Sequence, residues 1–172
     1  MGQSTVEEPT PGVRVCWAWH WGAALVLAAT VSVLLARYED LPDPYPVHYG
    51  LTGTADGFAS RSHVLVLLPV VIGATLVVAI AVSHAAHVRS LRTALQRPVG
   101  RYDHLDWTAQ RGPASVAVLG PVNLLLAVVF SGVSLLPVVG ALAGSLMTWG
   151  GLCLLVAVLA ASSVRARRRQ RG

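Results

Sequence analysis

Four long apolar runs alternate with polar segments along the chain. The runs cover residues 15–36, 64–83, 114–136 and 142–163. An α-helix rises about 1.5 Å per residue, so about 20 apolar residues cross the roughly 30 Å hydrocarbon core of a bilayer. Each run reaches or exceeds this length. The pattern therefore predicts an all-α integral membrane protein with four transmembrane helices.

The segments between the runs complete the predicted organisation. We expect one membrane domain over residues 15–163, a disordered polar tail at 1–14 and a basic tail at 164–172. The first run is longer than the apolar core of a cleaved signal peptide, which is about 7–15 residues. We therefore expect it to stay as a membrane span. The third and fourth runs together far exceed one span, so the PVVGA segment at 137–141 predicts a tight turn between two helices.

Composition supports lipid as the main solvent. Only 12% of the 172 residues are charged and 54% are hydrophobic, whereas a soluble domain carries about 25% charged residues. All 13 basic residues are arginines, and they flank the apolar runs instead of forming one basic face. This distribution is typical of membrane topology signals and gives no indication of nucleic-acid binding.

The arginines also predict which way the chain crosses the membrane. With four spans, eleven of the 13 arginines lie on the side of the two termini, and only Arg37 and Arg61 lie on the other side. Cytoplasmic segments are enriched in such residues. We therefore expect a multi-pass protein of the cytoplasmic membrane with both termini in the cytoplasm. Arg37 and Arg61 are expected to reach the headgroups from the helix ends.

The loop at residues 37–63 is the most distinctive polar segment. Three alternating prolines, at 42, 44 and 46, restrict φ at their own positions and favour extended geometry before them, so a stiff extended arm is predicted. Glycines at 50, 53 and 57 permit positive φ, and Asp56-Gly57 predicts a turn. We expect a structured Pro/Gly-rich loop between the first two membrane helices.

Three polar side chains of this loop are candidates for chemistry. Asp43, His48 and Asp56 offer carboxylate and imidazole groups that suit a divalent ion such as zinc or manganese. The alternative is that the carboxylates cap turns and that the histidine bonds the backbone. We expect the second reading, and so predict no metal and no cofactor.

Four polar residues lie in or beside the apolar runs. His20 stands among three tryptophans and is expected at the membrane interface. His84 and His87 are helical neighbours that could hold a metal, although the spacing indicates no third ligand. Asn123 either bonds across helices or lines a substrate path.

The loop closely resembles that of a bacterial membrane family, domain of unknown function 1648. The shared pattern is LPD-x-x-P-x-H-x-x-x-x-G-x-x-D-G followed by a basic residue. The matching positions are Leu41, Pro42, Asp43, Pro46, His48, Gly53, Asp56, Gly57 and Arg61. Gly50 stands where the family often has Asn, and Arg61 where it commonly has Lys. The domain also occurs in SdpI-type immunity proteins, which protect cells from a secreted peptide toxin and take part in signalling.

Three functions remain open on this evidence. The first is a non-enzymatic membrane protein whose outer loop binds a peptide, an ion or an envelope component, with SdpI-like resistance or signalling as one form. Its candidate residues are Pro42, Asp43, Pro46, His48, Gly53, Asp56 and Arg61. The second is a transporter or permease accessory subunit. The third, a metal-dependent membrane enzyme, is the one we least expect, because no HExxH motif or nucleophile elbow is present.

The predicted partners follow from this reading. The lipid bilayer surrounds the spans, and an extracellular peptide or a cytoplasmic protein is the expected ligand. A homo-oligomer is compatible with the small residues at the start of the last run, where Gly144 follows Gly140 of the predicted turn with GxxxG spacing.

Overall fold

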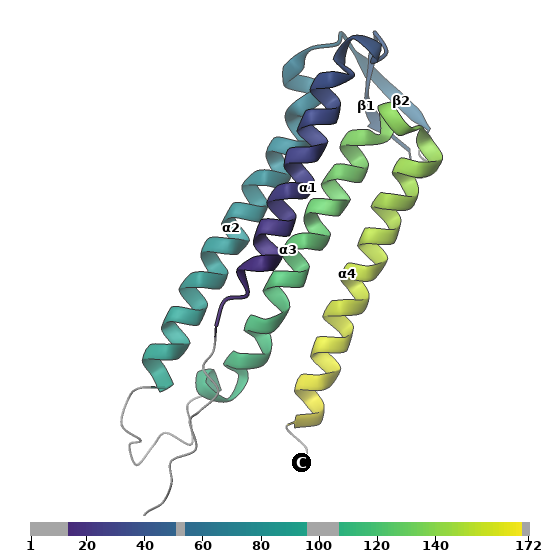
Figure 1. Ribbon diagram of the computed structural model, residues 1–172. Coiled ribbons are helices and arrows are strands. Elements are labelled where there is room, and N and C mark those ends of the chain that lie inside the picture. The colour runs from purple at the N-terminus through teal and green to yellow at the C-terminus, as the bar shows by residue number, and fades with distance from the viewer. Residues whose placement is uncertain (1–13, 51–53, 96–106, 170–172) are drawn as a thin grey trace, which may run out of the picture.

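The computed structural model describes residues 14–50, 54–95 and 107–169. Four helices form an elongated bundle: α1 (Trp17–Ala36), α2 (His63–Leu95), α3 (Trp107–Val139) and α4 (Ala141–Arg169) (Figure 1). All four contain a stretch long and apolar enough to cross a membrane. The predicted all-α, four-span membrane protein is confirmed.

The helices extend beyond the apolar runs that predicted them. Helix α2 continues past residue 83 through Arg89 and Arg92 to Leu95, and α3 begins at Trp107. Arginine is a good helix former, so its polarity ends the lipid-compatible stretch without ending the helix. The polar segment between the second and third runs is therefore partly helical, and residues 96–106 lie outside the described part.

The turn between α3 and α4 is shorter than predicted. Helix α3 continues through Pro137 to Val139, and the chain reverses at Gly140, whose φ is 84°. Side chains disfavour this left-handed region, whereas glycine adopts it readily and commonly ends helices in it. A single glycine thus replaces the predicted five-residue turn.

Helix α3 is central to the packing. It contacts α1, α2 and α4, and α1 also contacts α2. One buried cluster joins these elements: Ala23, Leu27 and Leu34 from α1, Val66, Val70 and Val77 from α2, Ala127 from α3, and Leu41 and Tyr45 from the segment that follows α1. Helix α4 packs mainly on α3 and exposes large apolar side chains such as Leu142 and Leu146, as expected for a helix that faces lipid.

A small β-hairpin lies at one end of the bundle. After a short 3-10 helix, η1 (Tyr38–Asp40), strands β1 (Tyr45–Tyr49) and β2 (Ala55–Ala59) pair antiparallel. Figure 1 shows the hairpin at the end where α1 finishes and α2 begins, opposite the C-terminus. Because Leu41 and Tyr45 are buried in the main core, the hairpin segment is anchored to the helices.

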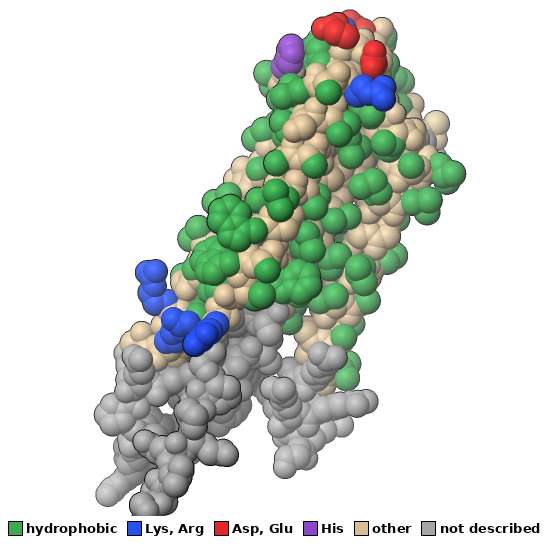
Figure 2. Space-filling view, in the orientation of Figure 1, with side chains coloured by type: hydrophobic (Ala, Val, Ile, Leu, Met, Phe, Trp, Pro, Cys, Tyr) green, Lys and Arg blue, Asp and Glu red, His purple; other side chains and the backbone are tan. Residues whose placement is uncertain are grey.

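Charge differs between the two ends of the bundle. Arg14 precedes α1, and Arg89 and Arg92 lie in the last turns of α2, so all three are at the end opposite the hairpin. Figure 2 shows basic side chains at this end of the bundle and acidic side chains, together with basic ones, at the other end. The hairpin and this arginine-rich end therefore lie on opposite sides of the apolar, membrane-spanning part of the helices.

Candidate functional site

The hairpin forms where the sequence predicted an extended arm followed by a turn at Asp56-Gly57. The extended arm is confirmed from Tyr45 onward, but the turn prediction is wrong, because Asp56 and Gly57 lie within β2. The reversal lies before β2, where the Gly50 N–H donates to the Thr54 carbonyl over 2.9 Å. Glycine at 57 serves another purpose: a Cβ there would lie 2.8 Å from Cβ of His48 on the paired strand.

His48 and Asp56 contact each other across the two strands, through Nδ1 of the imidazole and Oδ1 of the carboxylate. Both remain accessible, with side chains 72% and 55% exposed. The sequence suggested these residues, together with Asp43, as metal ligands, or otherwise as a turn cap and a backbone partner. The structure pairs them with each other on the outer surface of the hairpin.

Arg61, just after β2, holds the segment that precedes the hairpin. Its Nη1 donates to the carbonyls of Tyr38 at 2.9 Å, Glu39 at 3.0 Å and Leu41 at 2.7 Å. Its Nη2 also reaches the Glu39 carboxylate at 3.3 Å. Its side chain is only 18% exposed. The prediction that Arg61 reaches toward headgroups is wrong, because the carbonyls of the segment after α1 offer the guanidinium nearer acceptors.

Three further contacts stabilise this arrangement. Oδ1 of Asp43 accepts the backbone N–H of Arg61 over 3.2 Å. The Tyr38 ring stacks on His63 with 3.8 Å between ring centroids, and the Arg61 guanidinium carbon lies 4.9 Å from the Tyr38 ring centroid. Residues before β1 and after β2 are thus held together, which closes the base of the hairpin.

The remaining predicted site residues do not converge on one point. Pro46 is buried within β1, Pro42 is exposed, and Gly53 lies outside the described residues. Arg37, the other arginine at this end, bonds the Asp40 carboxylate at 3.3 Å on the surface. The loop residues therefore divide into a structural group around Arg61 and an exposed pair, His48 and Asp56.

Two tyrosines of β1 have shifted acidity. Burial raises the pKa of Tyr45, and burial together with the neighbouring Tyr45 raises the pKa of Tyr49 to about 12. Both phenols are therefore neutral at physiological pH. The Tyr49 hydroxyl is buried and has no hydrogen-bond partner within the described part of the chain.

A second polar cluster lies inside the helix bundle. Nδ2 of Asn123 in α3 lies 2.6 Å from Nδ1 of His20 in α1, and Nε2 of His20 lies 2.8 Å from Nδ1 of His84 in α2. His84 is 2% exposed and Asn123 is fully buried. The expected interfacial role of His20 is wrong, whereas the bonding of Asn123 across helices agrees with the sequence. Nothing in the sequence showed that these three residues meet.

The described residues contain no group of three or more His, Cys, Asp or Glu side chains that could hold a metal ion. His84 bonds His20 through Nδ1, and His87, its helical neighbour, is exposed. Neither the hairpin nor the buried cluster therefore offers the ligand set of a typical protein metal site.

Comparisons with known proteins agree with the sequence motif. A search of curated proteins and a search of solved structures found no match. Residues 25–73, which run from within α1 through the hairpin into α2, match the family described as Domain of unknown function (DUF1648). The hairpin and its Arg61 contacts therefore lie in the part of this membrane protein that is similar to the DUF1648 domain.

Proposed function

We propose that the protein is a non-enzymatic membrane protein whose hairpin faces the outside of the cytoplasmic membrane and binds an extended peptide. The main observation is the hairpin itself: a small sheet fixed to the bundle, with polar and apolar side chains exposed on it. The excess of arginines at the opposite end of the bundle supports this orientation, because cytoplasmic ends are enriched in arginine.

The hairpin carries surface features that suit a peptide ligand. Val47 in β1 and Phe58 in β2 are exposed large apolar side chains on the same two strands that carry the exposed pair His48 and Asp56. Apolar anchors combined with a polar pair are common in peptide recognition. A peptide could use its own apolar side chains on Val47 and Phe58 and bond the imidazole or the carboxylate.

The backbone provides a second means of recognition. In the described part of the chain, β1 and β2 pair only with each other, so each has one edge without a strand neighbour. An extended peptide can add to such an edge through main-chain hydrogen bonds, with side-chain contacts giving specificity. This favours a peptide over a single ion, for which the described residues offer no three-ligand group. Resistance to a peptide toxin of the SdpI type is one role consistent with this ligand.

Panning a random peptide library tests the proposal. The target is the full chain in lipid nanodiscs, with counter-selection on empty nanodiscs. We expect enriched peptides whose affinity falls about tenfold or more in Phe58→Ser, the cost of losing one apolar anchor. Val139→Ser is the matched control, because Val139 is also exposed and lies at the same end of the bundle.

Two results would reject the proposal. One is the absence of enrichment over empty nanodiscs. The other is enrichment of peptides that bind Phe58→Ser and Val139→Ser equally well, since these would not recognise the hairpin.

The buried cluster of His20, His84 and Asn123 favours one alternative, a transporter or permease accessory subunit. Ionisable side chains within membrane spans commonly mark ion or solute pathways. If the Asn123 amide donates to Nδ1 of His20, then Nε2 of His20 carries the proton that bonds Nδ1 of His84. These two hydrogen bonds leave Nε2 of His84 and Oδ1 of Asn123 buried without partners in the described structure.

Proton flux into proteoliposomes, read with an enclosed pH-sensitive dye, tests this alternative. We expect flux above that of empty vesicles, lost in His84→Ala and kept in His87→Ala, since His87 is an exposed neighbour on the same helix. Flux no greater than in empty vesicles would remove the alternative.

A further inference from the structure

A cavity of about 300 Å³ lies at the arginine-rich end, between the start of α1 and the last turns of α2. Seven residues of the described part of the chain line it: Arg14, Val15, Trp17, Ala85, Val88, Arg89 and Arg92. Its volume is about ten times the 30 Å³ that a water molecule occupies in the liquid, so it can admit a polar group larger than water. It lies at the opposite end of the bundle from the hairpin.

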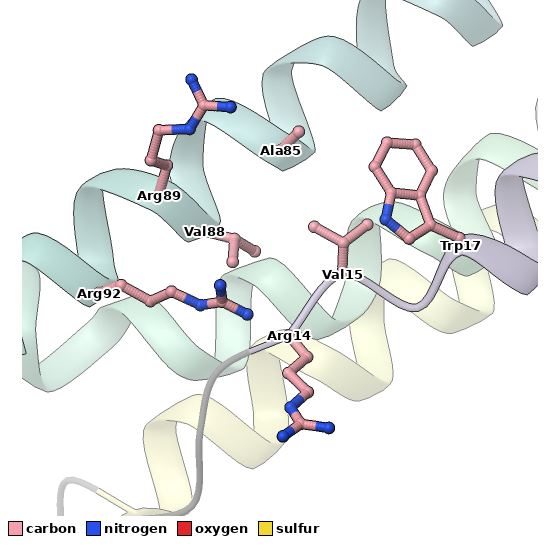
Figure 3. Close-up of a pocket in the computed structure, with 7 residues that line it drawn as sticks. All are labelled: Arg14, Val15, Trp17, Ala85, Val88, Arg89 and Arg92. Atoms are coloured by element: carbon pink, nitrogen blue, oxygen red, sulfur yellow. The ribbon is translucent and has the colours of Figure 1, made fainter.

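The lining has a strong positive charge. Among the seven described residues that line it, three are arginines and none is acidic. In Figure 3, the Arg92 side chain reaches from α2 toward Val15, whereas the guanidinium groups of Arg89 and Arg14 point outward on either side of the opening. Guanidinium groups bind phosphate oxygens through paired hydrogen bonds. The charge of this cavity therefore suits a phosphate.

The rest of the lining is apolar. Val15 packs against the buried residues Val88 and Leu91, so the arginines surround an apolar floor. Figure 3 shows Val15, Val88 and Ala85 between the arginines and Trp17. A ligand that is anionic on one side and apolar on the other matches this division better than a free inorganic ion does.

The level of the cavity in the membrane indicates the source of the phosphate. Trp17 begins both α1 and its candidate span, and it is exposed, as are Trp19 and Trp21. Exposed tryptophans at the start of a span mark the interface, where the phosphates of phospholipids lie. The cavity therefore opens at the level of the headgroups.

We propose that this cavity binds the headgroup of an anionic phospholipid. The phosphate lies at the opening, with Arg14 and Arg89 on either side of it, and the glycerol lies against Val15 and Val88. A zwitterionic headgroup would bring its own cation toward the arginines, so the site prefers a lipid such as phosphatidylglycerol. A bound lipid would connect the segment before α1 to the end of α2.

Native mass spectrometry tests this inference. The purified full chain in detergent is titrated with an equimolar mixture of phosphatidylglycerol and phosphatidylcholine, and the bound lipids are counted. Each arginine removed from beside the bound phosphate should weaken binding about fivefold. We expect the double variant Arg14→Gln/Arg89→Gln to lower retention of phosphatidylglycerol by about tenfold or more, with no change for phosphatidylcholine.

The matched control is Arg165→Gln/Arg167→Gln, which removes two arginines from the last turns of α4, at the same end of the bundle. This control should retain phosphatidylglycerol as the parent protein does. Equal losses in the two double variants would show a non-specific charge effect and overturn the proposal. No loss in Arg14→Gln/Arg89→Gln would also overturn it.

Competition with inorganic phosphate tests whether the cavity binds the phosphate of a lipid headgroup or free phosphate. When inorganic phosphate is added in large excess at constant ionic strength, it should leave the bound phosphatidylglycerol in place, because the lipid also contacts the apolar floor. Displacement of the lipid by inorganic phosphate would overturn the assignment to a headgroup.

Discussion

Replacing Arg61 by methionine tests how the hairpin is held. Methionine keeps much of the apolar stem and removes the charge together with three hydrogen bonds to the carbonyls of Tyr38, Glu39 and Leu41. A hydrogen bond to a charged group contributes about 1.5–3 kcal/mol. Because the three bonds share one nitrogen and part of the site is exposed, their free-energy contributions do not add fully. We expect a total loss of about 2–4 kcal/mol.

This loss should be local to the hairpin and its base. Hydrogen exchange measured by mass spectrometry on the protein in nanodiscs reports the opening of each segment. A loss of 2 kcal/mol or more corresponds to exchange about 30-fold faster or more over residues 41–59. Exchange in the buried parts of α1 and α3 should change little.

Arg37→Met is the control for this prediction. Arg37 also lies at the end of α1, but it forms an ion pair with Asp40 in which both side chains are exposed. Such exposed pairs contribute about 0–1 kcal/mol to stability. Unchanged exchange in Arg61→Met, or equal acceleration in the two variants, would refute the role assigned to Arg61.

Three further predictions concern the hairpin and the helix packing. Gly57→Ala should destabilise the hairpin by about 1–3 kcal/mol, because the new Cβ would lie 2.8 Å from Cβ of His48; faster hydrogen exchange of β1 and β2 would show it. Stability should fall as pH rises from 10 toward about 12, because Tyr49 ionises at its ordinary pKa of 10.0 once unfolded but at about 12 when folded; thermal unfolding of Tyr49→Phe should lose part of this dependence. Gly144→Leu should separate α4 from α3, because even a Cβ at Gly144 would lie 3.0 Å from the Leu136 Cα; we expect a lower melting temperature in detergent.

The helical architecture could be predicted from the sequence because apolar length alone decides which segments cross a bilayer. The exact helix ends could not, since residues such as Arg89 and Trp107 continue a helix beyond the lipid-compatible stretch. The turn at Gly140 was placed in the correct segment but predicted too long.

The hairpin was harder to predict than the helices. Its strands are five residues long and contain Pro46 and Gly57, which single-residue preferences assign to turns. The pairing of His48 with Asp56 depends on the register of the two strands. The bonds of Arg61 depend on carbonyls about 20 residues earlier in the chain. Neither feature is visible as a local pattern.

The cluster of His20, His84 and Asn123 shows the same limit within the bundle. Its members are separated by 64 and 103 residues along the chain. Hydrophobic periodicity identified each helix as a span but does not give the rotation of one helix against another. The sequence therefore marks each residue only singly, and the contact of the three depends on how the helices pack.

Cysteine accessibility in intact cells tests most directly that the hairpin faces outward. A single cysteine at Thr54, beside β2, is compared with one at Thr93, near the end of α2, in a Cys16→Ser/Cys153→Ser background; both threonines are exposed. A membrane-impermeant thiol reagent should label the cysteine at position 54 and leave that at position 93 unlabelled. Labelling only at position 93 would place the hairpin in the cytoplasm and contradict an external peptide ligand.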